Sequence, residues 1–129
     1  MNLPVPPMLL ITDRTMARES LEAVLDRAFQ GGCRWVMVRE KDISPDQRMA
    51  LVESLLKIAK PYDAKILVNS DLNAAEIAHG VHLPQGHSCK NARATLGPDK
   101  MIGVSAHNIG EAGAAASAGA DYATISPIF

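Results

Sequence analysis

Apolar and polar positions along this chain follow a repeating order: a short apolar run, a few polar residues, and then a segment with helical periodicity. Apolar runs with few polar interior positions are typical of strands that are covered on both faces. A strand–helix unit that repeats predicts a parallel sheet with helices packed outside it. Six strands are expected, at residues 8–12, 35–39, 65–69, 80–83, 101–105 and 122–129.

Helices are expected between successive strands. Apolar residues within 21–28 recur at i, i+3, i+4 and i+7, which marks an amphipathic helix. The second helix is expected to begin at Ser44, an N-cap residue that is followed by proline, and to stop before Pro61. Three shorter helices complete the expected set, at residues 71–77, 91–96 and 109–118.

The sixth apolar run reaches the end of the sequence with no helix after it. Eight such units would close a TIM (β/α)8 barrel, whose active site is built from the loops at the carboxyl ends of its strands. The pattern therefore predicts an α/β fold of this barrel type that is incomplete, with about six parallel strands and about five helices. We expect one partial-barrel domain over residues 1–129, with the proline-rich residues 1–7 as a lead-in.

Composition places the chain among ordinary globular proteins, because 47% of its residues are hydrophobic and 21% are charged. Its net charge of -1 offers no basic surface for a nucleic-acid backbone, so nucleic acid is not expected as a partner. The two cysteines are isolated, and there is no signal peptide and no apolar run of roughly 18 residues. These features predict a cytoplasmic protein without a membrane partner.

Polar side chains are concentrated where the expected strands end. Arg39 offers a planar fork of donors for phosphate oxygens, Lys41 adds a mobile charge, and Asn69 and Ser105 add neutral donors. Because the carboxyl ends of parallel strands share one edge, we expect these side chains, together with Gln85, to bind a small anionic molecule that carries phosphate. The alternative is that the charged residues after the second strand form a solvated loop.

Titratable side chains at the same edge are candidates for acid–base chemistry or metal binding. His87 and His107 fall in expected rim loops, where an imidazole can act as a general acid or base near neutral pH. His82 lies inside an expected strand and is interpreted as a satisfied core residue. Asp71 is the candidate ligand for Mg²⁺, a hard cation that commonly takes one or two carboxylates together with substrate phosphate.

Several stretches of the chain together resemble the thiamine-phosphate synthases and their relatives, the thiazole tautomerases of the TenI group. They fall in the family's order and cover nearly the whole chain, so the set is more specific than any one motif. The matching stretches are LITD at residues 10–13, GGCRWVMVREKD at 31–42, LVN at 67–69, GVHL at 80–83, LGPDK at 96–100, IGVSAH at 102–107, AGADY at 118–122 and SPIF at 126–129.

This resemblance implies a TIM barrel and a role in thiamin biosynthesis. In the synthase, hydroxymethylpyrimidine diphosphate loses pyrophosphate, and thiazole phosphate captures the resulting pyrimidine cation to give thiamin phosphate. Mg²⁺ and basic residues stabilise the leaving pyrophosphate. By the same resemblance, Arg39, Lys41, Asn69 and Ser105 would hold the diphosphate of the pyrimidine substrate.

The chain departs from both branches of the family at informative positions. Met37 stands where the synthase pattern has Gln, and Ser70 and His87 stand where it has the carboxylates that hold Mg²⁺. Pro127 stands where the tautomerases place a catalytic His. Three interpretations follow: a synthase-like enzyme, a thiazole tautomerase that uses His87 or His107, and a non-catalytic phosphate-ligand-binding or regulatory relative.

The expected sheet has two open edges, at its first and sixth strands. Natural proteins cover or pair such edges, because unpaired backbone groups there recruit other chains. We therefore expect a homo-oligomer, or a partner chain that completes the barrel. The resemblance also implies later strands with Gly-rich phosphate loops that have no counterpart in the 129 residues, so this chain alone would not complete a thiazole-phosphate site.

Overall fold

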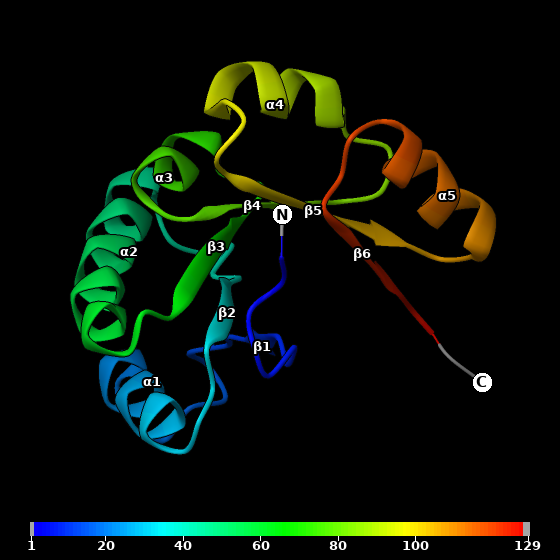
Figure 1. Cartoon of the computed structure of the whole chain (residues 1–129). Coiled ribbons are helices and arrows are strands. Elements are labelled where there is room, and N and C mark those ends of the chain that lie inside the picture. The colour runs from blue at the N-terminus through cyan, green and yellow to red at the C-terminus, as the bar shows by residue number, and fades with distance from the viewer. Residues whose placement is uncertain (1, 128–129) are drawn as a thin grey trace.

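The computed structural model describes residues 2–127 of the chain. Within this range, six strands form a parallel sheet in which every strand pairs with its neighbour in sequence, from β1 to β6. The sheet curls, and five helices cover its outer side, as Figure 1 shows. The fold is an incomplete TIM-like barrel, so the expected fold class is confirmed.

Most element boundaries lie close to those that the sequence predicts. The strands are β1 (Leu10–Ile11), β2 (Trp35–Val38), β3 (Lys65–Asn69), β4 (Gly80–Leu83), β5 (Met101–Ala106) and β6 (Tyr122–Ile125). The helices are α1 (Leu21–Gln30), α2 (Pro45–Ala59), α3 (Leu72–Ile77), α4 (Cys89–Leu96) and α5 (Ile109–Ser117), and the 3-10 turn η1 (Lys60–Tyr62) follows α2. Across residues 2–127, no helix combines the length and the apolar character that crossing a bilayer requires.

Each α-helix begins at a side chain that accepts a hydrogen bond from the helix's own backbone. Ser44 accepts from the N–H of Gln47, and the Gln47 side chain accepts from the N–H of Ser44, which completes a capping box. Asp71 caps α3 by accepting from the N–H of Ala74. These caps fix the points at which the chain turns away from the carboxyl rim of the sheet. The remaining caps are Ser20, Ser88 and Asn108.

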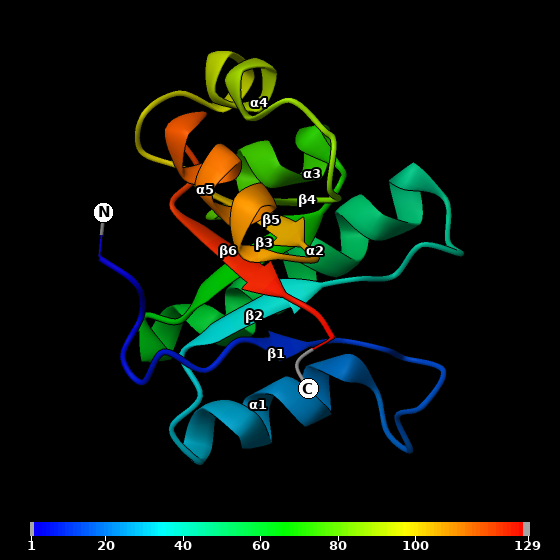
Figure 2. The ribbon, with the colours of Figure 1, turned by 90° about the vertical axis from the view of Figure 1, so that its right-hand side faces the viewer.

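The two edge strands are shorter than predicted. β1 contains 2 residues instead of the run 8–12, and Ile11 is 51% exposed because β1 pairs with β2 alone within the described range. β6 ends at Ile125 rather than at residue 129, and Pro127 has no N–H to continue the ladder. Residues 128–129 of the predicted strand lie outside the described part. Figure 2 shows both edges, with β6 toward the viewer and β1 below it.

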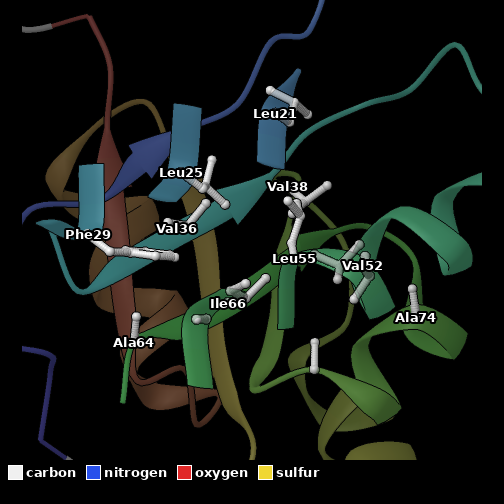
Figure 3. Close-up of a cluster of buried hydrophobic side chains, with 13 residues drawn as sticks. Leu21, Leu25, Phe29, Val36, Val38, Val52, Leu55, Ala64, Ile66 and Ala74 are labelled. Atoms are coloured by element: carbon white, nitrogen blue, oxygen red, sulfur yellow. The ribbon is translucent and has the colours of Figure 1, made fainter. Parts of the chain in front are cut away.

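The largest cluster of buried side chains fills the space between the sheet and the helices α1 and α2 (Figure 3). Leu25, Phe29 and Leu55 of the helices and Val36 and Ile66 of the strands are completely buried there. A second cluster lies under α3, α4 and α5 and is rich in alanine. Because burying one large apolar side chain is worth about 1.5–3 kcal/mol, the first cluster is the stronger anchor of the fold.

Side chains along β2 alternate between the helix side and the concave side of the curled sheet. Val36 and Val38 belong to the cluster under the helices, so Trp35, Met37 and Arg39 point to the concave side. The amino-terminal end of this concave side is closed by a third buried cluster. Its members are Trp35, Leu67 and Met101, with Leu3, Leu9 and Tyr122 packed against them.

Candidate functional site

A buried carboxylate ties the end of β1 to the end of β2. Glu40 is 3% exposed and accepts hydrogen bonds from the Thr12 hydroxyl at 2.7 Å and from the backbone N–H of Arg14 at 3.1 Å. The Arg14 guanidinium forms ion pairs with Glu40 at 3.4 Å and with Asp42 at 2.9 Å. The hydrogen bond from Arg14 holds the pKa of the Asp42 carboxyl below its ordinary value. These contacts fix the loop that carries Lys41.

Arg48 joins the same loop to the start of α3. Its guanidinium donates to the carbonyls of Glu40 and Ile43, each at 3.1 Å, and to the Asp71 carboxylate at 2.9 Å. Both side chains of the Arg48–Asp71 pair are 15% exposed. Sequence reasoning missed Arg48, although a signal was available. A cation near the start of α2 faces the positive end of the helix dipole, so it needs a partner outside that helix.

Residues at the ends of β2 and β3 line a hollow of about 400 Å³, called here the β2–β3 hollow. It brings together Lys41, Asn69 and Asp71, three of the side chains that the sequence places in the site. The Asn69 amide donates to the Ser70 hydroxyl at 3.2 Å. With the Arg48 guanidinium in the same wall, the hollow combines two cations with amide and hydroxyl donors, a set suited to phosphate oxygens.

A second hollow, of about 310 Å³, lies between the ends of β4 and β5 and the helix α5. It contains Gln85, His87 and Ser105 of the predicted site, and Ala114 and Ala115 of α5 form its apolar wall. The Gln85 and His87 side chains are exposed in the loop that precedes α4. The residues predicted from sequence are therefore divided between two hollows at the carboxyl rim.

Arg39 and His107 line neither of these two hollows. The Arg39 side chain is exposed on the concave side of the sheet, and its backbone N–H donates to the Thr12 hydroxyl at 3.0 Å. His107 is exposed, and the Glu111 carboxylate lies 3.2 Å from its Nδ1 and accepts from its backbone N–H at 2.7 Å. His107 is thus tied to the first turn of α5, and it is not brought into the hollow that contains His87.

On the concave side, a buried histidine links two hydroxyl groups. His82 is 2% exposed, with Nδ1 at 2.8 Å from the Tyr122 hydroxyl and Nε2 at 2.8 Å from the Ser105 hydroxyl. Burial, and then the nearby charge of Arg39, lower the pKa of His82 to about 4. Burial, and then the charge of Asp121, raise the pKa of Tyr122. His82 is a satisfied buried residue, as its position within a strand predicts, but its partners are polar side chains that the sequence did not reveal.

The donor set at the rim does not fit a resident Mg²⁺ ion. One Asp71 oxygen accepts from the N–H of Ala74 and the other is paired with Arg48. Both oxygens of Asp42 are bound to Arg14. Over residues 2–127, no three His, Cys, Asp or Glu side chains are grouped so that they could hold a metal ion. The Mg²⁺ ion that the family resemblance implies would therefore have to displace existing ion pairs.

The fold and the rim define an α/β protein of TIM-barrel type with a polar carboxyl edge. Comparison with known sequences narrows this class. The sequence model of the thiamine monophosphate synthase family (TMP-TENI) matches residues 8–129, and the chain belongs to this family. The family resemblance that the motifs indicate is therefore confirmed.

Individual relatives agree with this assignment. The thiamine-phosphate synthase of Clostridium botulinum (strain Loch Maree / Type A3) is 39% identical over 126 residues, which are 95% of this chain and 62% of that protein. The thiamine-phosphate synthase of Clostridium novyi (strain NT) is 38% identical over 126 residues, with the same coverage of 95% and 62%. The solved structure of thiamine phosphate pyrophosphorylase from Pyrococcus furiosus matches with a TM-score of 0.85 at 26% identity, covering 94% of this chain and 60% of that chain. This chain spans about three fifths of the length of these relatives.

Proposed function

We propose that this chain acts in thiamin biosynthesis as a thiamine-phosphate synthase-like protein. In this reaction, hydroxymethylpyrimidine diphosphate and thiazole phosphate give thiamin phosphate and pyrophosphate. Family membership and the relatives' names support the proposal. The structural observation that carries it is the β2–β3 hollow, where Lys41, Arg48 and Asn69 converge at the carboxyl ends of two parallel strands. A diphosphate is the part of the substrates that these donors suit best.

The chemistry follows from where negative charge develops. When pyrophosphate leaves the pyrimidine carbon, charge accumulates on its oxygens, and fixed cations at that place lower the barrier. Lys41 supplies a mobile charge. Of the five N–H groups of Arg48, three bind Glu40, Ile43 and Asp71 within residues 2–127, which leaves two for a ligand. Asn69 adds an amide donor. No step of this scheme passes through a metal ion.

Titration with inorganic pyrophosphate in the presence of EDTA tests the diphosphate site directly. We expect Lys41→Met to weaken binding about tenfold to hundredfold, because a hydrogen bond to a charged group is worth about 1.5–3 kcal/mol. Lys57→Met is the matched control, since Lys57 is an exposed lysine of α2 outside the hollow. Equal affinities for the wild type and the Lys41→Met variant would contradict the placement of the diphosphate.

Catalysis is tested by turnover. The purified chain is mixed with both substrates and Mg²⁺, and thiamin phosphate is measured by chromatography against a reaction without protein. Product above that background supports synthase activity. A folded chain that binds pyrophosphate without forming product favours the non-catalytic interpretation. The tautomerase alternative gains no support from the site, because His87 and His107 are both exposed and lie in different places.

The partners that we propose are the phosphorylated pyrimidine and thiazole, together with additional polypeptide at the sheet edges. Within the described range, β1 and β6 are each paired on one side only, and Ile11 and Ile125 are exposed there. Such edges favour self-association or a partner chain. Light scattering on the purified chain measures this, and a stable monomer at high concentration would exclude self-association through these edges. A cytoplasmic location stays a prediction.

A further inference from the structure

The three polar side chains on the concave side are held in one arrangement by their surroundings. The Tyr122 ring packs directly against Gly103, where a Cβ would overlap that ring. Trp35 packs edge-on against the same ring, with 4.9 Å between the ring centroids. The Tyr122 hydroxyl is therefore fixed beside Nδ1 of His82, and Ser105 is fixed beside Nε2.

The hydrogen bonds that join Tyr122, His82 and Ser105 can run in either of two directions. A neutral imidazole has one N–H donor and one lone-pair acceptor, while each hydroxyl can donate or accept. At pH 7 His82 is neutral, because burial lowers its pKa to about 4. In one orientation Tyr122 donates to Nδ1 and the Nε2–H donates to Ser105. In the other, Ser105 donates to Nε2 and the Nδ1–H donates to Tyr122.

The acidity of the two hydroxyls favours the first orientation. A phenol, with a reference pKa of about 10, is a stronger acid and hence a better donor than the aliphatic hydroxyl of serine. Its oxygen is also the weaker acceptor, because one lone pair is delocalised into the ring. The hydrogen bond at one ring nitrogen of a histidine sets which nitrogen keeps the proton. Donation by Tyr122 to Nδ1 therefore leaves the proton of His82 on Nε2.

We propose that Tyr122 and His82 are positioning residues that leave the hydroxyl proton of Ser105 free for an oxygen of an anionic ligand that extends from Asn69, in the β2–β3 hollow, across the concave side of the sheet. Asn69 pairs in register with His82 on the neighbouring strand, and His82 contacts the Ser105 hydroxyl. With Nε2–H donating to its oxygen, Ser105 keeps its own proton free for that ligand. In the opposite orientation the Ser105 hydroxyl donates its proton to Nε2 of His82. Only the lone pairs of the Ser105 oxygen then face the negatively charged phosphate. The ligand part of this inference rests on the proposed function, whereas the proton position on His82 does not.

The first experiment reads the tautomer directly and needs no ligand. Long-range ¹H–¹⁵N NMR spectra of the ¹⁵N-labelled wild-type chain at pH 7 distinguish a protonated from an unprotonated ring nitrogen. Loss of the signals in His82→Gln identifies His82. We expect the proton on Nε2, with Nδ1 unprotonated. A proton on Nδ1 in the wild type would overturn the proposal.

The second experiment is a double-mutant cycle with inorganic pyrophosphate as the probe. We expect Ser105→Ala to weaken binding about tenfold to hundredfold, as loss of a hydrogen bond to a charged group, worth about 1.5–3 kcal/mol, does. Tyr122→Phe is expected to weaken binding by a smaller factor, and the double variant to bind no worse than Ser105→Ala alone. Tyr62→Phe, which changes the other tyrosine, on the helix side of the sheet, is the control and should bind as the wild type does.

The outcomes separate the two proposals. Additive losses in the double variant would show that Tyr122 does not act through Ser105, which overturns the positioning role. A wild-type chain that fails to bind pyrophosphate, or a Ser105→Ala variant that binds it normally, would contradict the anionic ligand while the NMR result still decides the proton position. Coupled losses together with an Nε2 proton support the whole inference.

Discussion

The two halves of the carboxyl rim are held together by different chemistry. Around β1 to β3, Arg14 and Arg48 bridge neighbouring loops through ion pairs with carboxylates. Around β4 to β6, His82 links two hydroxyl groups without a formal charge. The first half is therefore sensitive to charge reversal and salt, while the second depends on one imidazole staying neutral. The rim thus combines a half held by ion pairs with a half held by neutral hydrogen bonds.

The packing beneath the rim shows the same division. Within residues 2–127, the cluster under α1 and α2 has thirteen buried members, among them Phe29, whereas the cluster under α3 to α5 has eight, of which three are alanine and none is aromatic. Larger side chains bury more apolar surface, so each one contributes more to stability. We therefore expect the first half to be the stable platform and the second half to open more readily.

The largest expected effect comes from the stable platform. Phe29→Ala removes a completely buried ring and should lower the free energy of unfolding by about 3–5 kcal/mol. Leu96→Ala, which truncates a partly exposed side chain packed on the second cluster, should cost clearly less. Urea unfolding followed by circular dichroism measures both. Equal losses would remove the distinction between the two halves.

Acid should weaken the hydrogen-bonded half. The pKa of His82 falls from 6.5 to about 4 in the folded chain, so the unfolded chain binds the proton more readily. The stability that this group contributes is fully present above pH 6.5 and is lost as the pH falls toward 4, by up to about 3 kcal/mol. Urea unfolding of the wild type and of His82→Gln between pH 4 and pH 8 isolates the effect. Parallel pH profiles for the two proteins would disprove it.

Replacing two glycines with alanine should change the stability of the chain in opposite directions. Gly103→Ala places a methyl group against the Tyr122 ring and should destabilise the chain by about 1–3 kcal/mol. Gly113 lies inside α5 with nothing close to an added Cβ, so Gly113→Ala should stabilise it by about 0.5–1 kcal/mol. Thermal unfolding of both variants checks the signs. A stable Gly103→Ala variant would mean that Tyr122 can move away from His82 freely.

The smallest expected change in stability concerns Asp71. Asp71→Asn keeps an N-cap side chain on α3 but removes the charge that neutralises Arg48, so stability should change by about 1 kcal/mol or less. Pyrophosphate binding in EDTA should become tighter. Asp63→Asn, which removes an exposed carboxylate that pairs with Lys65 before the start of β3, is the control and should leave pyrophosphate affinity unchanged. If Asp71 instead holds a metal, the Asn variant should lose Mn²⁺ binding measured by electron paramagnetic resonance.

The fold was largely predictable because its signals are local. Apolar runs locate the six strands, and caps such as Ser44 with Pro45 locate the helices within a few residues. The exceptions are the edge strands, where the apolar run 8–12 predicts a length that pairing with a single neighbour does not support. The local sequence pattern indicates which secondary structure a segment favours, but it does not indicate how many neighbouring strands that segment pairs with.

The site was less predictable, because its contacts join residues that are distant in sequence. Lys41 and Asn69 could be placed at one edge from the strand pattern alone, and they do share a hollow. The pair Arg48–Asp71 spans 23 positions and the pair His82–Tyr122 spans 40, and neither spacing has a motif. The separation of Gln85, His87 and Ser105 from that hollow depends on α5 packing beside β5, which polarity at strand ends does not reveal.

The strictly sequential order of the sheet has a consequence for how the chain is made. Each strand joins only the strand translated before it and the one translated after it, so a growing edge is always ready when the next unit leaves the ribosome. Each pairing closes a loop of at most 30 residues, for example Trp35 with Lys65, so its entropy cost is smaller than that of pairing strands from distant parts of the sequence. The segment through β3 already contains most members of the largest apolar cluster, so we expect a nascent chain of that length to begin burying apolar surface while synthesis continues.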